Sequence, residues 1–223
     1  MPARLVTIAI SDVTGDRPED IGSGPTIADA TTLDDARAVL ARYGIEAPHM
    51  GGSESVKSLA GDYCIAASNG TALAAAAAEA ERLGYRPVLL GEAAGEARDV
   101  GRAHGQRALR TEGRCALISG GELTVTVRGT GRGGRNQEYA LGAAQVLAGS
   151  SVTGLAADSD GIDGNGHAAG AFFGGATAAD ARAAAAALDA NDSGAFLARA
   201  GDLFVTGPTG TNVSDLRILL TAP

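Results

Sequence analysis

Short apolar runs alternate along this chain with longer segments of helical composition. The apolar runs, several of them rich in valine and isoleucine, predict β-strands at residues 4–10, 63–67, 87–90, 115–119, 123–127, 152–157, 202–206 and 216–220. Segments rich in alanine and other good helix formers predict α-helices at residues 32–43, 71–84, 92–109, 136–147 and 177–188. This alternation predicts an α/β fold with a mostly parallel or mixed sheet and helices on both faces.

Residues 46–62 interrupt the alternation. The segment has little hydrophobic periodicity and is rich in glycine, serine and proline, which is typical of a connection between domains. We therefore expect a domain boundary near residue 58, with residues 1–58 before it and residues 59–223 after it. Most of the strong strand and helix patterns follow the boundary, so the second part should form its own core.

The composition limits the classes of partner. The net charge is −8, aromatic residues make up 4% of the chain and tryptophan is absent, which argues against binding to nucleic acid or to an anionic membrane. All basic residues except Lys57 are arginines, which suit the local binding of an anionic substrate. The first residues resemble neither a signal peptide nor a membrane anchor, so we expect a cytoplasmic protein. Cys64 and Cys115 lie in apolar runs and should be buried thiols, with a disulfide or metal pair as the alternative.

Four glycine-rich loops follow apolar runs, where ligands of α/β proteins commonly bind. In the first, at residues 11–26, Asp12 and Asp16 flank a glycine, and the backbone of Ser23 and Gly24 can donate hydrogen bonds to an anion. In the last, at residues 206–215, small and hydroxyl-bearing residues allow the close approach of a phosphate or nucleotide. Its candidate binding residues are Thr209, Gly210, Thr211 and Asn212. For both loops, a plain turn is the alternative.

The second loop, at residues 119–138, carries two competing signals. Gly129, Gly131 and Gly134 match the G-x-G-x-x-G pattern of dinucleotide-binding proteins, which is weak evidence for a nicotinamide cofactor. However, the preceding run alternates instead of being fully apolar, and two arginines occupy the loop. Arginines beside a helix N-terminus favour a phosphate site. The candidate binding residues are Gly131, Arg132, Gly133, Gly134, Arg135 and Asn136.

The third loop, at residues 156–164, places Asp158, Asp160 and Asp163 after a buried run. Its spacing differs from that of an EF-hand, because the glycine comes too early and no glutamate closes the loop. Such carboxylates can bind Mg²⁺ through the phosphates of a substrate, or act as general base toward a hydroxyl group. Asp160 and Asp163 are the candidates for both roles, and the guanidinium of Arg135 should lie near one of them. A turn stabilised by aspartate side chains is the alternative.

Taken together, four segments resemble the type-II glycerate kinase family, whose C-terminal module is called MOFRL and whose members are often labelled hydroxypyruvate reductase. The segments are SDVTGDRPEDIGSGPT, ISGGELTVTVRGTGRGGRNQEYAL, DSDGIDGNGHAAGA and GDLFVTGPTGTNVSDLRILL, in the order of the family. The resemblance implies ATP-dependent, Mg²⁺-assisted phosphorylation of the 2-hydroxyl group of D-glycerate, with Arg135 at the transferring phosphate or the substrate carboxylate. It also implies a MOFRL-like α/β domain at residues 59–223 and a remnant of a Rossmann-like N-terminal domain at residues 1–58.

The departures from the family are as informative as the matches. Chains of the family are considerably longer, and the first motif lies mid-chain in them. We therefore expect residues 1–58 to lack sheet neighbours and apolar cover, or to be covered by another copy in a homo-oligomer. Lys57 matches no family motif, and the family is thought to use a lysine of the missing N-terminal part, so the chain alone should be inactive. Two alternatives remain: a hydroxypyruvate reductase using NAD(P)H, and a non-catalytic truncated paralogue or fragment.

Overall fold

The computed structural model describes residues 4–46 and 54–222. They divide into two compact units, one drawn from Met1–Ala9 and Gly15–Ala66 and the other from Ile10–Thr14 and Ala67–Pro223. The sheet of the smaller unit has two strands, and the sheet of the larger unit has six.

The smaller unit contains β1 (Val6–Ile10), β2 (Asp62–Ala67), a short 3-10 helix η1 (Ile21–Ser23) and α1 (Leu33–Arg42). α1 begins at a capping box. The backbone N–H of Asp35 donates to Thr32 Oγ1 at 3.2 Å, and the Asp35 carboxylate accepts from the backbone N–H of Thr32 at 2.8 Å. This local cap stabilises the predicted helix although none of its residues is buried.

The apolar side chains of the smaller unit are largely exposed. Val6, Ile8 and Ile10 of β1 are exposed by 56%, 73% and 51%. Cys64 of β2 is also exposed, so the expectation of a buried thiol is wrong there, because it alternates with half-buried neighbours along a strand of a two-stranded sheet. Cys115 of the larger unit is buried as expected, and both thiols are free.

The larger unit is built on a mixed sheet with the strand order β3-β4-β8-β5-β6-β7. The strands are β3 (Arg86–Glu92), β4 (Cys115–Gly120), β5 (Thr153–Asp158), β6 (Gly170–Gly174), β7 (Leu203–Phe204) and β8 (Asp215–Leu220). β3 and β4 pair in parallel, whereas the other neighbours pair antiparallel. Of the two expected arrangements, the mixed sheet is therefore observed, because β8 inserts antiparallel between β4 and β5.

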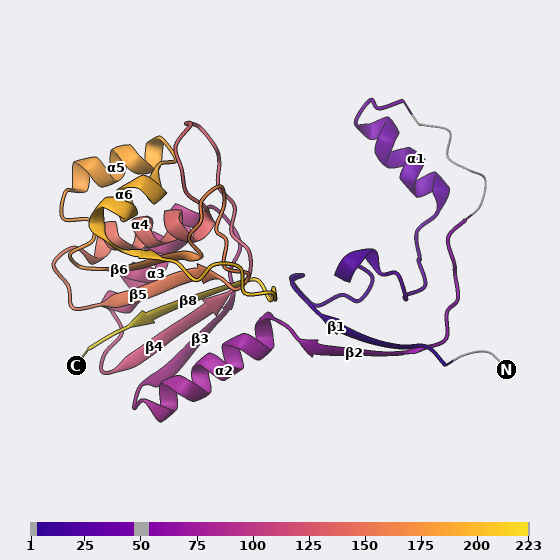
Figure 1. The fold of residues 1–223 in the computed structure, drawn as a ribbon, viewed down its shortest axis with the longest axis horizontal. Helices are drawn as coiled ribbons and strands as arrows, with labels where there is room; N and C mark the ends of the chain where they lie inside the picture. The colour runs from indigo at the N-terminus through magenta and orange to yellow at the C-terminus, as the bar shows by residue number, and fades with distance from the viewer. Residues whose placement is uncertain (1–3, 47–53, 223) are drawn as a thin grey trace. The chain divides into compact units, whose positions relative to one another are not determined.

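Helices cover both faces of this sheet, as expected (Figure 1). α2 (Asn69–Arg82) lies on one face, and the other carries α3 (Ala97–Leu109), α4 (Arg135–Leu147), α5 (Ala181–Asp189) and α6 (Ser193–Ala200). β4 contributes to the cores on both sides because its side chains alternate: Leu117 packs in the cluster with α3 and α4, and Ile118 packs in the cluster with α2. Within residues 4–46 and 54–222, no helix has both the length and the apolar character needed to cross a membrane.

Some elements differ from the sequence-based expectation. Residues 123–127 form no strand of the sheet, because Thr124 bridges to Glu96 and its N–H donates to the Gly95 carbonyl at 2.8 Å. The segment therefore pairs with the start of α3. The helix expected at residues 177–188 begins at Ala181, where Asp180 Oδ1 accepts from the third helical N–H and caps the first turn. β6 and α6 were not predicted, since their glycine- and alanine-rich sequences carry little periodicity.

Candidate functional site

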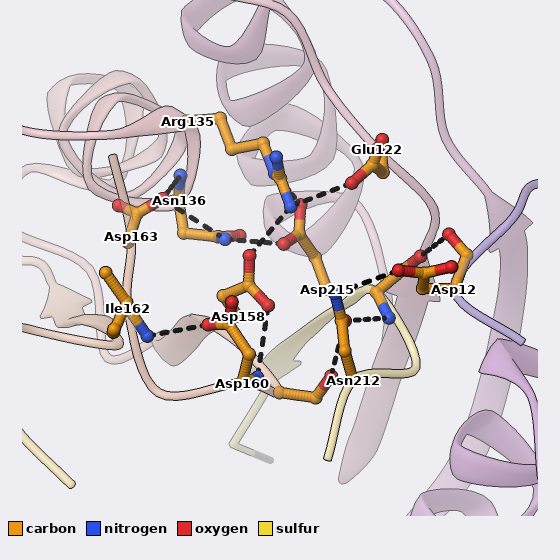
Figure 2. Close-up of polar contacts among 12 residues, drawn as sticks. Asp12, Glu122, Arg135, Asn136, Asp158, Asp160, Ile162, Asp163, Asn212 and Asp215 are labelled. Atoms are coloured by element: carbon orange, nitrogen blue, oxygen red, sulfur yellow. Dashed lines mark hydrogen bonds and ion pairs between the residues drawn. The ribbon is translucent and has the colours of Figure 1, made fainter. Parts of the chain in front are cut away.

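Polar side chains from four elements meet at one edge of the six-stranded sheet (Figure 2). Glu122 follows the end of β4, Asp158 ends β5, Asp215 begins β8 and Arg135 begins α4. Because β8 runs antiparallel to β4 and β5, its first residue lies at the same edge as their last residues. Asp158 and Asp215 are direct partners in the β5–β8 register. The geometry thus gathers three carboxylates and one arginine at the strand ends, where α/β proteins commonly bind ligands.

Arg135 is the central residue of this cluster. Its Nη2 lies 2.7 Å from Asp158 Oδ2 and 3.0 Å from Glu122 Oε1, and its Nε donates to Asp215 Oδ2 at 2.8 Å. Burial alone would lower the pKa of Arg135, but the hydrogen bond and charge of Asp215, with the charges of Glu122 and Asp158, raise it above its ordinary value. The guanidinium is therefore charged and held in one orientation. Its ion pairs are with Asp158, Asp215 and Glu122, and none is with Asp160 or Asp163 among the residues that the structure describes.

Asp158 is the acidic residue whose chemistry is most altered. Burial raises its pKa to about 7, with a further upward contribution from Asp215, while the backbone N–H of Asp160 and the charge of Arg135 act in the opposite direction. A carboxylate that titrates near neutral pH can accept or release a proton during a reaction. The sequence places Asp158 in the third glycine-rich loop, but Asp160 and Asp163 were the residues of that loop predicted to act in catalysis.

Asp163, predicted as catalytic and metal-binding, caps α4. It is buried, and its carboxylate accepts from the backbone N–H of Asn136 at 3.0 Å and of Gln137 at 2.9 Å, with a further bond from Gln137 Nε2 at 2.9 Å. Burial raises the pKa of Asp163, and these hydrogen bonds act against that change. Both oxygens are thus engaged, and this carboxylate holds the helix end that begins with Arg135.

Asp160 lies beside Asp158 and is half-buried. Its backbone N–H donates to Asp158 Oδ1 at 3.2 Å, and its own Oδ1 accepts from the Ile162 N–H at 2.7 Å. In the part of the chain that the structure describes, no group of three or more His, Cys, Asp or Glu side chains is arranged to hold a metal ion. Mg²⁺ in phosphoryl transfer needs only one or two carboxylates plus phosphate oxygens. Asp158 and Asp160 fit that smaller requirement, and Asp163 does not.

The glycine loop before α4 is packed against the protein itself. A Cβ at Gly129 would lie 2.2 Å from the Ala190 carbonyl oxygen, and one at Gly134 would lie 2.4 Å from Asp163 Cγ. The backbone N–H groups of the loop donate to acceptors within the protein. Those of Arg128 and Gly129 donate to Asn191 Oδ1 at 2.6 and 2.9 Å, and that of Gly131 donates to the Ala190 carbonyl at 3.1 Å. The N–H of Arg132 donates to Asp192 Oδ1 and that of Gly133 donates to Asn165 Oδ1, both at 3.0 Å. These donors are therefore not free for a phosphate, whether of a substrate or of a dinucleotide.

Two of the predicted binding residues beside this loop, Arg132 and Asn136, differ in their surroundings. Asn136 is fully buried, and its Nδ2 donates to Asp215 Oδ1 at 2.8 Å. The side chain of Arg132 is exposed and makes no ion pair with the residues that the structure describes. A joint role of Arg132 and Arg135 in binding an anion stays a prediction.

The loop at residues 206–212 lies beside the aspartate turn. The Thr209 N–H donates to the Asp160 carbonyl at 2.9 Å, and Asn212 Nδ2 donates to the Asp12 carboxylate at 3.2 Å. Asp12 is further held by Ser214 Oγ, which donates to its carbonyl at 2.8 Å. Within the larger unit, the loop at residues 206–212 thus contacts both the aspartate turn and Asp12. The tip residues Gly210 and Thr211 are exposed.

The remaining predicted residues belong to the smaller unit. Asp16 and Ser23 adopt positive φ angles of 52° and 64°, and Gly24 has a φ of 58°. A Cβ at Gly24 would lie 2.7 Å from the Glu19 carbonyl oxygen, so this glycine is required by its own turn. Their role in ligand binding stays a prediction.

The sequence-based reasoning missed Glu122 and Asp215. Glu122 lies two residues after the end of β4, between the runs predicted as strands at residues 115–119 and 123–127, and its place after a strand end was the signal that could have found it. Asp215 begins its strand, and in a parallel sheet that position would lie at the opposite edge. Only the antiparallel insertion of β8 places it beside Asp158.

Comparisons with known proteins agree with this architecture. A family model described as the MOFRL family matches residues 115–215, and one described as a domain of unknown function (DUF4147) matches residues 1–57. The crystal structure of glycerate kinase from Thermotoga maritima superposes with a TM-score of 0.92 at 37% sequence identity, covering 99% of this chain and 58% of that chain. The fold of the larger part of this chain is therefore one that a solved kinase shares.

Curated relatives cover nearly all of the chain. It is 44% identical to a protein of Agrobacterium vitis named "Putative hydroxypyruvate reductase", over 99% of this chain and 56% of the relative. It is 38% identical to D-glycerate 2-kinase of Thermotoga maritima, over 97% and 56%, and 32% identical to glycerate kinase of Macaca fascicularis, over 100% and 73%. The chain spans just over half the length of the first of these relatives. The chain belongs to the glycerate kinase family that carries the MOFRL module.

Proposed function

We propose that this chain carries the part of a glycerate 2-kinase that binds the anionic groups of its reactants, in the ATP-dependent phosphorylation of D-glycerate. The observation that carries the proposal is the cluster of Arg135 with Asp158, Asp215 and Glu122 at the sheet edge. The relatives named glycerate kinase support this choice of reaction. Phosphoryl transfer depends mainly on positioning and charge neutralisation, which a fixed guanidinium supplies.

Arg135 has a donor left for a ligand. Nε and Nη2 contact carboxylates, whereas Nη1 makes no hydrogen bond or ion pair within residues 4–46 and 54–222. Arginine binds carboxylates and phosphates through parallel N–H groups, and a side chain already fixed in place reorganises little when a ligand arrives. Arg135 would therefore bind the transferring phosphate or the carboxylate of D-glycerate.

Asp158 is the best candidate for the general base. Phosphorylation of an alcohol requires a group that accepts the hydroxyl proton, and a base is most effective when its pKa lies near the working pH. The pKa of Asp158, about 7, meets that condition. Its carboxylate lies 2.7 Å from Arg135, so a substrate bound by the arginine would place its hydroxyl group close to the base. Asp163, engaged in the cap of α4, would act by holding Arg135 in place.

Asp160 would hold Mg²⁺ together with phosphate oxygens, which leaves Asp158 free to act as the base. The ion would supply neutralisation of the phosphate charge. The half-buried position of Asp160 and its contact with the Asp158 carboxylate support this assignment. D-glycerate and the nucleotide are then the expected small-molecule partners, with ATP and Mg²⁺ as cofactors.

The reductase alternative has less support. Its sequence signal was the glycine pattern, and those glycines and amides are occupied by contacts with residues 190–192, Asn165 and Asp163. A dinucleotide site of the expected kind needs free amides at the start of a helix that follows a strand. The helix here follows an irregular segment, and its first amides bond to Asp163.

Thermal unfolding of the 223-residue chain with added ligands tests the proposal. ATP with Mg²⁺, ADP and D-glycerate should raise the melting temperature, and NADH and NADPH should not. Arg135→Met should remove the response to D-glycerate. Arg182→Met, at an exposed position of α5, is the matched control and should retain it. Stabilisation by a nicotinamide cofactor, without any by ATP or D-glycerate, would contradict the proposal and favour the reductase.

A further inference from the structure

Arg217 is a fully buried arginine in β8, and its contacts lead directly to the Arg135 cluster. Its Nη1 donates to the Gly120 carbonyl at 2.8 Å, and its Nη2 donates to the Gly121 carbonyl at 3.1 Å and pairs with Asp215. Burial of a charge is costly even when the charge is paired, and well-packed apolar residues often replace such pairs without loss of stability. Stability alone therefore does not account for this arginine.

The first contact of Arg217 fixes the turn that carries Glu122. Both carbonyls of the Gly120–Gly121 segment accept from Arg217, and the N–H of Gly121 donates to Asn69 Oδ1 at 3.1 Å. The carbonyl groups and an N–H group of this segment are thus all hydrogen-bonded to buried side chains. The next residue is Glu122, which contacts Arg135. Any rotation of these peptides would move the Glu122 side chain relative to Arg135.

The second contact concerns Asp215, which is also fully buried. Its Oδ2 accepts from Arg135 Nε at 2.8 Å and pairs with Arg217, while its Oδ1 accepts from Asn136 Nδ2 at 2.8 Å. One carboxylate therefore serves two arginines. Without Arg217, Asp215 would have Arg135 as its single cationic partner.

The balance of charge shows what the second arginine changes. Arg135 faces three carboxylates, those of Glu122, Asp158 and Asp215. If it alone neutralised them, an anionic ligand would meet a site of net negative charge and would be repelled. Arg217 compensates Asp215 from the interior side, where no ligand can reach. Arg217 therefore reduces the net negative charge that an anionic ligand would meet beside Arg135, although Glu122 and Asp158 still face Arg135 there.

We propose that Arg217 is a positioning residue of the Arg135 site: it orients Asp215 and the turn Gly120–Gly121–Glu122, and it compensates the charge of Asp215, which reduces the repulsion of an anion that binds at Arg135. The proposal rests on the proposed function for the identity of that anion. The orientation of Arg135 can be tested without it.

Arginine-side-chain NMR of the 223-residue chain gives the direct test. The Nε–Hε signal of Arg135, assigned by its loss in Arg135→Lys, should be shifted and protected from exchange by the bond to Asp215. In Arg217→Met the exchange rate should rise about tenfold or more, the size expected when a hydrogen bond to a charged group is lost. Arg217→Lys keeps the charge without the planar fork and should give an intermediate rate, which keeps the test valid if the methionine variant fails to fold.

Arg98 offers a matched control. It is a buried arginine of α3 that donates to the Glu138 carboxylate at 3.1 Å and to the Leu188 carbonyl at 2.7 Å. It also forms longer ion pairs with Glu96 and Asp189. Arg98→Lys should lower the melting temperature about as much as Arg217→Lys and leave the Arg135 signal unchanged. In ligand titrations, Arg217→Lys should weaken D-glycerate binding about tenfold, and Arg98→Lys should not.

The outcomes separate the two proposals. A folded Arg217 variant whose Arg135 signal and exchange match the wild type would overturn the positioning role. An equal change in Arg98→Lys would do the same, because the effect would then reflect general destabilisation. If the wild-type chain binds neither D-glycerate nor nucleotide, the proposed function fails, while the NMR comparison still decides the role of Arg217.

Discussion

Asp158 and Asp215 lie opposite each other in the β5–β8 pair, and the guanidinium of Arg135 bridges their carboxylates at 2.7 and 2.8 Å. Two carboxylates in such proximity disfavour each other's ionisation, and a cation between them offsets that repulsion. The ionisation of Asp158 and Asp215 therefore depends on the charge of Arg135. It also explains why the consequences of changing Arg135 should exceed the loss of a single ion pair.

Arg135→Lys should weaken the binding of D-glycerate and lower any turnover by about two orders of magnitude, because lysine cannot replace a planar fork that contacts several oxygens at once. Isothermal titration and a coupled assay for ADP release would measure the two effects. The exposed Arg182, replaced in the same way, is the control. Unchanged affinity in Arg135→Lys would remove this residue from the site.

The raised pKa of Asp158 predicts a specific pH dependence of stability. Because its folded-state pKa is about 7 and its unfolded-state pKa is near the ordinary value, the unfolded chain releases this proton first as the pH rises. The presence of Asp158 should therefore destabilise the fold progressively between about pH 4 and pH 7, by at most about 4 kcal/mol, and have a constant effect above about pH 8.

Denaturant unfolding of the wild type and of Asp158→Asn at several pH values would show this dependence as a difference. The free energy of unfolding of the wild type minus that of the variant should fall as the pH rises and then level off. Asp160→Asn, on the same turn, is the matched control. A difference that stays flat from pH 4 to pH 8 would show that Asp158 titrates normally.

Asp163→Ala should destabilise the protein through α4. The change leaves two helix N–H groups, those of Asn136 and Gln137, without their buried acceptor, which costs about 2 kcal/mol or more. Urea unfolding measures this loss, and Asp160→Ala should cost less because Asp160 is half-buried. If Asp163 instead bound a metal, its removal would lower the affinity for Mg²⁺ while leaving the metal-free stability nearly unchanged.

The sequence was sufficient for much of the fold because the strongest signals were local. The buried strands β4 and β5 and the alanine-rich helix α2 follow from runs of residues whose burial or propensity leaves few alternatives. The direction of β8 was not accessible in this way. The direction depends on the end of the sheet from which residues 215–220 enter between β4 and β5. The alternation of apolar and polar residues along a strand is the same for both directions.

The candidate site shows the same limit. The loop containing Arg135 and the turn containing Asp158 were found because glycine and aspartate mark loops at strand ends. The sequence predicted a catalytic and metal-binding role for Asp163, because an aspartate that caps a helix looks the same in the sequence as a catalytic aspartate. Only its distances to the backbone N–H groups of α4 show that it caps the helix. Nothing in the sequence indicated that Arg217 is buried, since a single arginine within an apolar strand usually marks an exposed position.

The glycines of the loop before α4 provide a test of packing against ligand binding. Gly129→Ala should destabilise the chain even without ligand, because the new Cβ would lie 2.2 Å from the Ala190 carbonyl oxygen. The cost should be about 1–3 kcal/mol, as for other overpacked positions. Gly70→Ala, whose Cβ would meet only Ser68 Oγ at 3.6 Å, is the control. Full stability of Gly129→Ala, combined with loss of nucleotide binding, would support a ligand-contacting role for this glycine.

The last prediction is that the 223 residues alone do not turn over D-glycerate. The chain covers 56% of the Thermotoga maritima D-glycerate 2-kinase, and β1 leaves Val6, Ile8 and Ile10 more than half exposed. Exposed apolar residues on a strand of a two-stranded sheet indicate a surface suited to association with another polypeptide segment, because an unpaired strand edge invites pairing.

Amide hydrogen exchange should therefore be fast in β1, β2 and α1 and slow in β4 and β5, whose residues are mostly buried. An assay for ADP release should then show no reaction above background, and the Arg135 cluster should still bind D-glycerate. Turnover of about 1 s⁻¹ or faster, the lower end for ordinary enzymes, would show that the catalytic machinery is complete within these residues.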